Sequence, residues 1–180
     1  MALAPPCFRY VILESIHMNA LADWQTLFAV QAGAAATLTG LVFVAMSINL
    51  AKIIEIPGLA GRAAESMLQF LQVFFVSSAV LLPRQPLTAL GCEILFVAAL
   101  SWLGQLTSQV RYARVRSGHP VKWLAQRVVT THVASIPLVV AAVMLILGNS
   151  GGLFVIMGGF FFSFVAGVVG AWVLLVEILR

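Results

Sequence analysis

Charged residues are scarce in this sequence. Asp, Glu, Lys and Arg make up 9% of its 180 residues, whereas soluble domains carry about 25% charged residues. Hydrophobic residues make up 62% of the chain, and the mean hydropathy is +1.06. A soluble fold of this length could not cover so much apolar surface with so few charges. The composition therefore excludes an ordinary soluble domain and predicts an integral membrane protein.

Cysteines and catalytic motifs are also sparse or missing. The only cysteines are Cys7 and Cys92, so there is no disulfide framework and no CxxC metal motif. The sequence has no GxSxG, no HExxH, no Walker loop and no glycine-rich dinucleotide turn. The segments between the apolar runs are too short to build a soluble catalytic domain. We therefore expect no enzymatic activity, no metal site and no cofactor.

No linker rich in Ser, Gly or Pro divides the chain. We expect one transmembrane domain over residues 23–180, preceded by an N-terminal extension over residues 1–22. Ala20-Leu21-Ala22 resembles a signal-peptidase site, but the apolar run Tyr10–Leu13 is too short for a signal-peptide core. Met18 is an alternative start, which would make residues 1–17 an upstream extension.

Apolar segments of transmembrane length follow one another along the chain. A membrane-spanning helix needs about 20 mostly apolar residues. Five segments meet or approach this length, at about residues 28–50, 66–82, 87–106, 128–147 and 153–179. The second is short and stops at Pro83, so the second and third could instead form a re-entrant hairpin, and Pro137 predicts a kink in the fourth. The sequence predicts an all-α integral membrane bundle of about five transmembrane helices.

Basic residues cluster in the loop after the third span. This loop contains Arg111, Arg114, Arg116, Lys122 and Arg127. Because Lys and Arg in short loops stay in the cytoplasm, we expect the N-terminus outside, the C-terminus inside, and a multi-pass location in the cell inner membrane. These charges flank an apolar segment instead of alternating with exposed aromatics, which favours membrane lipids as partners and argues against nucleic acid.

Glu93 is the most informative polar residue near the outer side. An ionised side chain near the bilayer centre costs at least about 2.5 kcal/mol, and we expect Gln31 and Ser78 at a similar depth on their own helices. One interpretation is a proton-titrating or cation-attracting carboxylate that faces a pore or cavity. The alternative is a protonated carboxyl that is hydrogen-bonded to Gln31 or Ser78.

A second polar group follows one face of the second span. Glu65, Gln69 and Gln72 are spaced i, i+4 and i+7, so they share a helical face. Polar residues expected in the same cytoplasmic half on the other spans are Ser47, Asn49, Gln105 and His132. This group would line a vestibule or pore, or would form interhelical hydrogen bonds inside the bundle. A lone His without a second ligand at suitable spacing indicates packing, not metal binding.

Small residues recur at every fourth position on two spans. The stripe on the fifth span is Gly159, Ser163, Gly167 and Ala171, and the stripe on the first is Ala32, Ala36 and Gly40. Such stripes let helix backbones approach closely. We therefore expect the first and fifth spans to pack at close range, either within the chain or against another copy.

The first span carries a recognisable sequence. The stretch AATLTGLVFVAMSINL over Ala35–Leu50, with Pro57-Gly58-Leu59 soon after, resembles small uncharacterised bacterial inner-membrane proteins. The resemblance covers mainly the first half of the chain. It implies a bacterial multi-pass protein, and it implies no activity and no functional residue.

Two hypotheses of function fit these features. The leading one is a small homo-oligomeric channel or pore-like transport protein for ions or small polar solutes. In it, the glutamine-bearing second helix lines an axial pore and Glu93 forms an outer cation-attracting ring. The alternative is a regulatory or scaffolding subunit that binds a larger membrane protein partner through its small-residue stripes.

Overall fold

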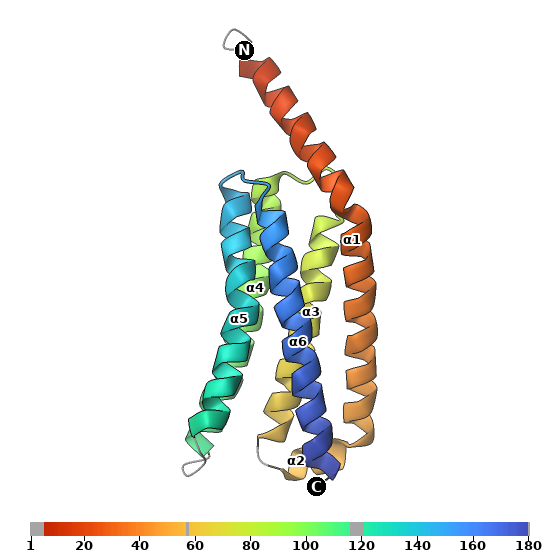
Figure 1. The fold of residues 1–180 in the computed structure, drawn as a ribbon, viewed down its shortest axis with the longest axis vertical. Helices are drawn as coiled ribbons and strands as arrows, with labels where there is room; N and C mark the ends of the chain where they lie inside the picture. The colour runs from red at the N-terminus through yellow and green to blue at the C-terminus, as the bar shows by residue number, and fades with distance from the viewer. Residues whose placement is uncertain (1–5, 57, 116–120, 180) are drawn as a thin grey trace.

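The chain folds as a bundle of long helices (Figure 1). The structure is a computed structural model that describes residues 6–56, 58–115 and 121–179. Its helices are α1 (Pro6–Ile48), α2 (Leu50–Glu55), α3 (Leu59–Val80), α4 (Leu87–Val115), α5 (Val121–Ile146) and α6 (Gly152–Leu179), and no strand occurs among the described residues. Five of these helices are long and apolar enough to cross a membrane. The all-α fold of a multi-pass membrane protein is therefore confirmed.

Several helices extend beyond the apolar segments that predicted them. α3 begins at Leu59 and not near residue 66, and α4 continues to Val115 instead of ending near residue 106. At about 1.5 Å per residue, both exceed the roughly 30 Å hydrocarbon core of a bilayer, which favours two full spans over a re-entrant hairpin. α5 runs through Pro137, and α1 continues across the expected domain boundary at residues 22 and 23.

Two tight turns close the same end of the bundle. Pro83 cannot continue the hydrogen bonding of α3, and Arg84 turns the chain with a φ of 57°. After α5, Gly148 adopts a φ of 79°, a left-handed conformation that glycine tolerates without strain. We name this the hairpin end, and the opposite end, with α2 and the C-terminus, the α2 end (Figure 1).

α3 is the central helix of the bundle. It packs against α1, α4 and α6, while α5 packs against α4 and α6. Near the hairpin end the space between the helices is filled by apolar side chains, among them Phe28, Val76, Ile94, Leu138 and Phe160. A smaller apolar cluster of Ile53, Leu59, Ala63 and Leu174 lies near the α2 end. Between this cluster and the large apolar core, α3 turns its polar face toward its neighbours.

α1 is the most exposed of the five spanning helices. Only 11% of its most apolar window is buried, against 50% for α3, and α1 continues beyond the hairpin end (Figure 1). Its contacts with α6 include the ring pairs Trp24–Phe154 at 4.6 Å and Phe28–Phe160 at 5.9 Å. α1 is therefore attached mainly along one side, through α3 and a few aromatic rings.

The two small-residue stripes have different surroundings. On α6, a Cβ added at Gly159 would meet Leu138 of α5 at 2.8 Å, and one at Gly167 would meet Phe70 of α3 at 2.6 Å. On α1, Ala36 and Gly40 are exposed, and a Cβ at Gly40 would meet no atom within 4 Å. The α6 stripe thus packs closely against α5 and α3 within this chain, whereas Ala36 and Gly40 of the α1 stripe face outward.

Candidate functional site

The glutamine face of α3 points into its own bundle. The exposed fractions of Gln69 and Gln72 are 3% and 1%. Gln72 Nε2 donates to Ser163 Oγ of α6 at 2.7 Å and to Gln69 Oε1 at 2.7 Å, and Gln69 Nε2 donates to Gln105 Oε1 of α4 at 2.6 Å. The interhelical hydrogen bonding considered for these residues is thus present. An axial pore lined by this face is wrong in its location, because the amides lie inside a single chain.

Glu65, on the same face, forms a buried ion pair. Arg127 of α5 donates from Nε to Glu65 Oε2 at 3.1 Å and from Nη2 to Glu65 Oε1 at 2.7 Å. The side chains of Arg127 and Glu65 are only 8% and 11% exposed, and the Arg127 guanidinium lies 4.7 Å from the ring centre of Tyr112. Removing either partner would leave a charge with little access to water.

Arg127 was missed as a site residue because its position at the edge of an apolar run looks like a loop charge. α5 begins at Val121, so Arg127 lies inside the helix and at the depth of Glu65. A carboxylate expected inside the bundle was the available signal, since such a group commonly pairs with a basic residue from a neighbouring helix.

Further polar contacts tie the helices together near the α2 end. Gln109 Nε2 of α4 donates to Thr131 Oγ1 of α5 at 2.8 Å. Arg62 of α3 pairs with Glu177 of α6 at 3.2 Å, with side chains that are 15% and 37% exposed. Sequence reasoning selected none of these four residues, because each lies at or beyond the edge of an apolar segment, where polar residues are common.

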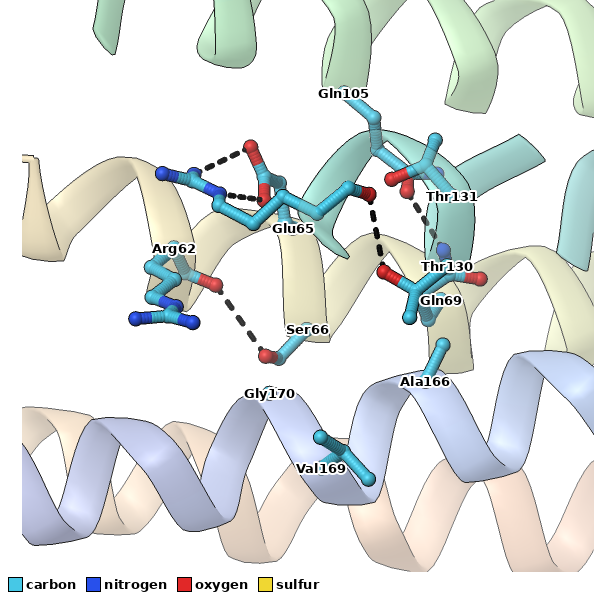
Figure 2. Close-up of a pocket in the computed structure, with 11 residues that line it drawn as sticks. Arg62, Glu65, Ser66, Gln69, Gln105, Thr130, Thr131, Ala166, Val169 and Gly170 are labelled. Atoms are coloured by element: carbon cyan, nitrogen blue, oxygen red, sulfur yellow. Dashed lines mark hydrogen bonds and ion pairs between the residues drawn. The ribbon is translucent and has the colours of Figure 1, made fainter. Parts of the chain in front are cut away.

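A small cavity opens between these polar groups (Figure 2). It has a volume of about 50 Å³ and is lined by residues from α3, α4, α5 and α6, including Arg62, Glu65, Ser66, Gln105, Arg127, Thr131 and Gly170. Each water in liquid water occupies about 30 Å³, so the cavity holds one or two groups of that size. Gly170 lets α6 pass close to Ser66 beside the cavity, because a Cβ there would force the Ser66 hydroxyl to rotate away.

Glu93 and Ser78 lie together, but outside this network. They line a groove of about 540 Å³ between α3 and α4, whose other lining residues include the exposed Phe75 and Phe96. Ser78 Oγ donates to the Phe74 carbonyl at 2.8 Å, and Gln31 on α1 does not line the groove. The groove is on the outer surface of the bundle, so Glu93 does not face the interior cavity.

Asn49 and His132 have local hydrogen bonds. Asn49 Nδ2 donates to the Ala45 carbonyl at 2.9 Å, where α1 ends and α2 begins. His132 Nδ1 lies 2.7 Å from the Val128 carbonyl of its own helix, and its ring is 6.0 Å from that of Trp102. Neither residue lines the cavity. Within the part of the chain that the structure describes, no group of three or more His, Cys, Asp or Glu could hold a metal ion.

The geometry therefore selects a buried polar network with a cavity at its centre as the candidate site. Comparisons with protein-family models, with curated proteins and with solved structures found no match for this chain.

Proposed function

We propose that this protein is a small membrane transport protein that moves ions or small polar solutes through the interior of its own helical bundle. The observation that carries the proposal is the buried Glu65–Arg127 pair beside a cavity within the spanning helices. Ionisable groups inside a membrane are expensive, by at least about 2.5 kcal/mol each on insertion scales, and they commonly mark ion and substrate pathways.

The route is closed in this conformation. Near the hairpin end, Phe28, Leu138 and Phe160 fill the space between the helices and are buried. A polar solute that reaches the cavity from the α2 end therefore meets a tightly packed apolar barrier. Transport requires this barrier to open, and α1 is the element that can move with the smallest loss of contacts, since it is held mainly by α3.

The test is flux into liposomes that contain the purified protein. A paired variant, Glu65→Gln with Arg127→Gln, removes both charges without leaving one unpaired, and we expect it to abolish flux of the transported solute. Glu55→Gln is the matched control, because Glu55 is exposed on α2 and does not line the cavity. Absence of any ion or solute flux by the unaltered protein would overturn the proposal.

Glu93→Gln distinguishes the interior route from a route between copies. If flux is lost in Glu93→Gln and kept in the paired variant, the path runs along the outer groove of α3 and α4, as in a pore formed by several copies. If flux is lost only in the paired variant, the path runs through the cavity of one chain.

A second function is favoured by the outward stripe on α1. Ala36 and Gly40 are exposed, and small residues on a lipid-facing helix allow another helix to approach closely. This supports association with another copy or a role as a regulatory or scaffolding subunit of a larger membrane partner. Gly40→Leu fits in open space, so we expect it to leave the fold intact and to abolish association measured as mass in mild detergent. Unchanged mass and unchanged partner binding would exclude this interface.

A further inference from the structure

The amide chain in the network has a fixed direction. Ser163 Oγ donates its hydrogen to the Gly159 carbonyl at 2.8 Å, so it can only accept from Gln72, which must present Nε2. The same Nε2 also donates to Gln69 Oε1, which leaves Gln69 Nε2 to donate to Gln105 Oε1. One serine hydroxyl thereby sets the orientation of all three amides.

The chain ends on a donor at the cavity. Gln105 accepts through Oε1, so its Nε2 is the terminal group, and this nitrogen is buried without a hydrogen-bond partner in the described part of the chain. Gln105 is fully buried, with 0% exposure, and lines the cavity. In Figure 2 its side chain extends from α4 toward Gln69 of α3. Buried donors are nearly always satisfied, so whatever fills the cavity must offer an acceptor.

The remaining lining also presents N–H and O–H donors. The side chains that line the cavity include two guanidinium groups, Arg62 and Arg127, of which Arg62 pairs with Glu177 and Arg127 with Glu65. Arg127 gives Nε–H and one Nη–H to Glu65 and carries further N–H donors. Thr131 Oγ1 already accepts from Gln109, so its hydroxyl hydrogen remains to donate.

The carboxylate of this lining is already engaged. Both oxygens of Glu65 already receive an N–H from Arg127. A water that accepted from Gln105 would bring two donors of its own into this lining. A monatomic anion accepts several hydrogen bonds and brings no donor, so it matches the lining better. The cavity volume of about 50 Å³ also admits a group of water size, about 30 Å³.

From this donor set we infer that the cavity is a binding site for a small monovalent inorganic anion of halide size, held by the Gln105 amide, Arg127 and Thr131. The site deepens the proposed function, because it names the class of solute. It rests on that function only in treating the cavity as part of the transport route.

Chloride binding is measured in detergent, without any flux, by the broadening of the chlorine NMR signal. We expect the unaltered protein to broaden the signal beyond protein-free micelles, and bromide to reverse the broadening. Gln105→Glu keeps an oxygen that accepts from Gln69 and replaces the terminal donor by a negative oxygen. This variant should reduce the broadening to the level of protein-free micelles. Gln25→Glu makes the same chemical change at an exposed position on α1 and should leave the broadening unchanged.

The outcomes separate the site from the transport proposal. No broadening by the unaltered protein, or equal broadening by Gln105→Glu, overturns the anion site. Anion binding without flux in liposomes keeps the site and refutes transport, whereas flux of a cation without chloride binding keeps transport and refutes the anion site. If Gln105→Glu fails to fold, bromide competition in the unaltered protein decides, because unspecific broadening does not saturate.

Discussion

Near the hairpin end the helices meet through apolar and aromatic side chains, whereas toward the α2 end they meet through amides, hydroxyls and ions. Phe28 and Leu138 represent the first region, and Gln72 and Gln105 the second. In a membrane the lipid chains are as apolar as the protein, so burial of apolar side chains adds no hydrophobic driving force between helices. The helices of the apolar region are therefore held together by close packing, and those of the polar region by hydrogen bonds and ion pairs. Variants should therefore damage the two regions in different ways.

The largest expected effect is in the polar region. Arg127→Ala leaves the Glu65 carboxylate, 11% exposed, without its partner, and breaking a buried ion pair in this way costs about 3–5 kcal/mol. We expect a loss of stability of this size in reversible unfolding by denaturing detergent. The paired variant Glu65→Gln with Arg127→Gln should recover most of it, since no charge stays unpaired.

The comparison between the single and the paired variant isolates the charge. If both lose the same stability, the loss comes from packing of the Arg127 side chain, including its contact with the Tyr112 ring at 4.7 Å. The polar region would then depend on shape as much as the apolar region does.

A smaller loss of stability is expected in the apolar region, where the helices are held by close packing. A Cβ at Gly91 of α4 would lie 2.8 Å from the Ala142 carbonyl oxygen of α5, and backbone cannot move aside as a side-chain tip can. Gly91→Ala should therefore lower the free energy of unfolding by about 1–3 kcal/mol, as overpacking commonly does.

Gly158→Ala is the matched control in the same half of the bundle. A Cβ at Gly158 meets no atom within 4 Å, so the higher helix propensity of alanine should raise stability by up to about 1 kcal/mol. Equal changes in both variants, measured by the same detergent titration, would mean that close packing between α4 and α5 does not hold the apolar region.

The sequence predicted correctly which residues share a helix face. It predicted less well whether each face contacts another helix of the chain or the surroundings. The spacing of Gln69 and Gln72 predicts one polar face, because helical periodicity is local. Whether that face lines a pore axis between copies or the interior of one bundle depends on which helices surround α3. The spacing of residues along α3 does not contain this information. The α1 and α6 stripes make the same point, since Gly40 is exposed and Gly167 is packed against Phe70.

The roles of Gly91 and Arg127 could not be predicted from a sequence pattern. Gly91 is a single glycine with no stripe around it, and only the approach of the α5 backbone shows why it is needed. If the α6 stripe faced outward, Gly167→Leu would test partner binding. Because Gly167 lies against Phe70, this substitution would instead disrupt packing within the chain. The depth of Arg127 was hidden for a related reason, since a charge at the edge of an apolar run belongs equally to a loop or to a helix.

The smallest expected effect is that of Ser163→Ala. Alanine fits the space of serine in the α6 stripe, so packing is kept, while the acceptor for Gln72 and the bond from Ser163 to the Gly159 carbonyl within α6 are lost. Hydrogen bonds between membrane helices contribute about 0.6 kcal/mol on average, and Gln72 still has Gln69 as a partner. Ser78→Ala is the control, because the Ser78 hydroxyl donates to the Phe74 carbonyl of its own helix, and its loss should change stability by less. If Ser163→Ala proved more damaging than Gly91→Ala, the polar region would depend on the direction of its amide chain more than the apolar region depends on its fit. Ser163 would then stabilise α3, α4 and α6 together and not one contact between two of them.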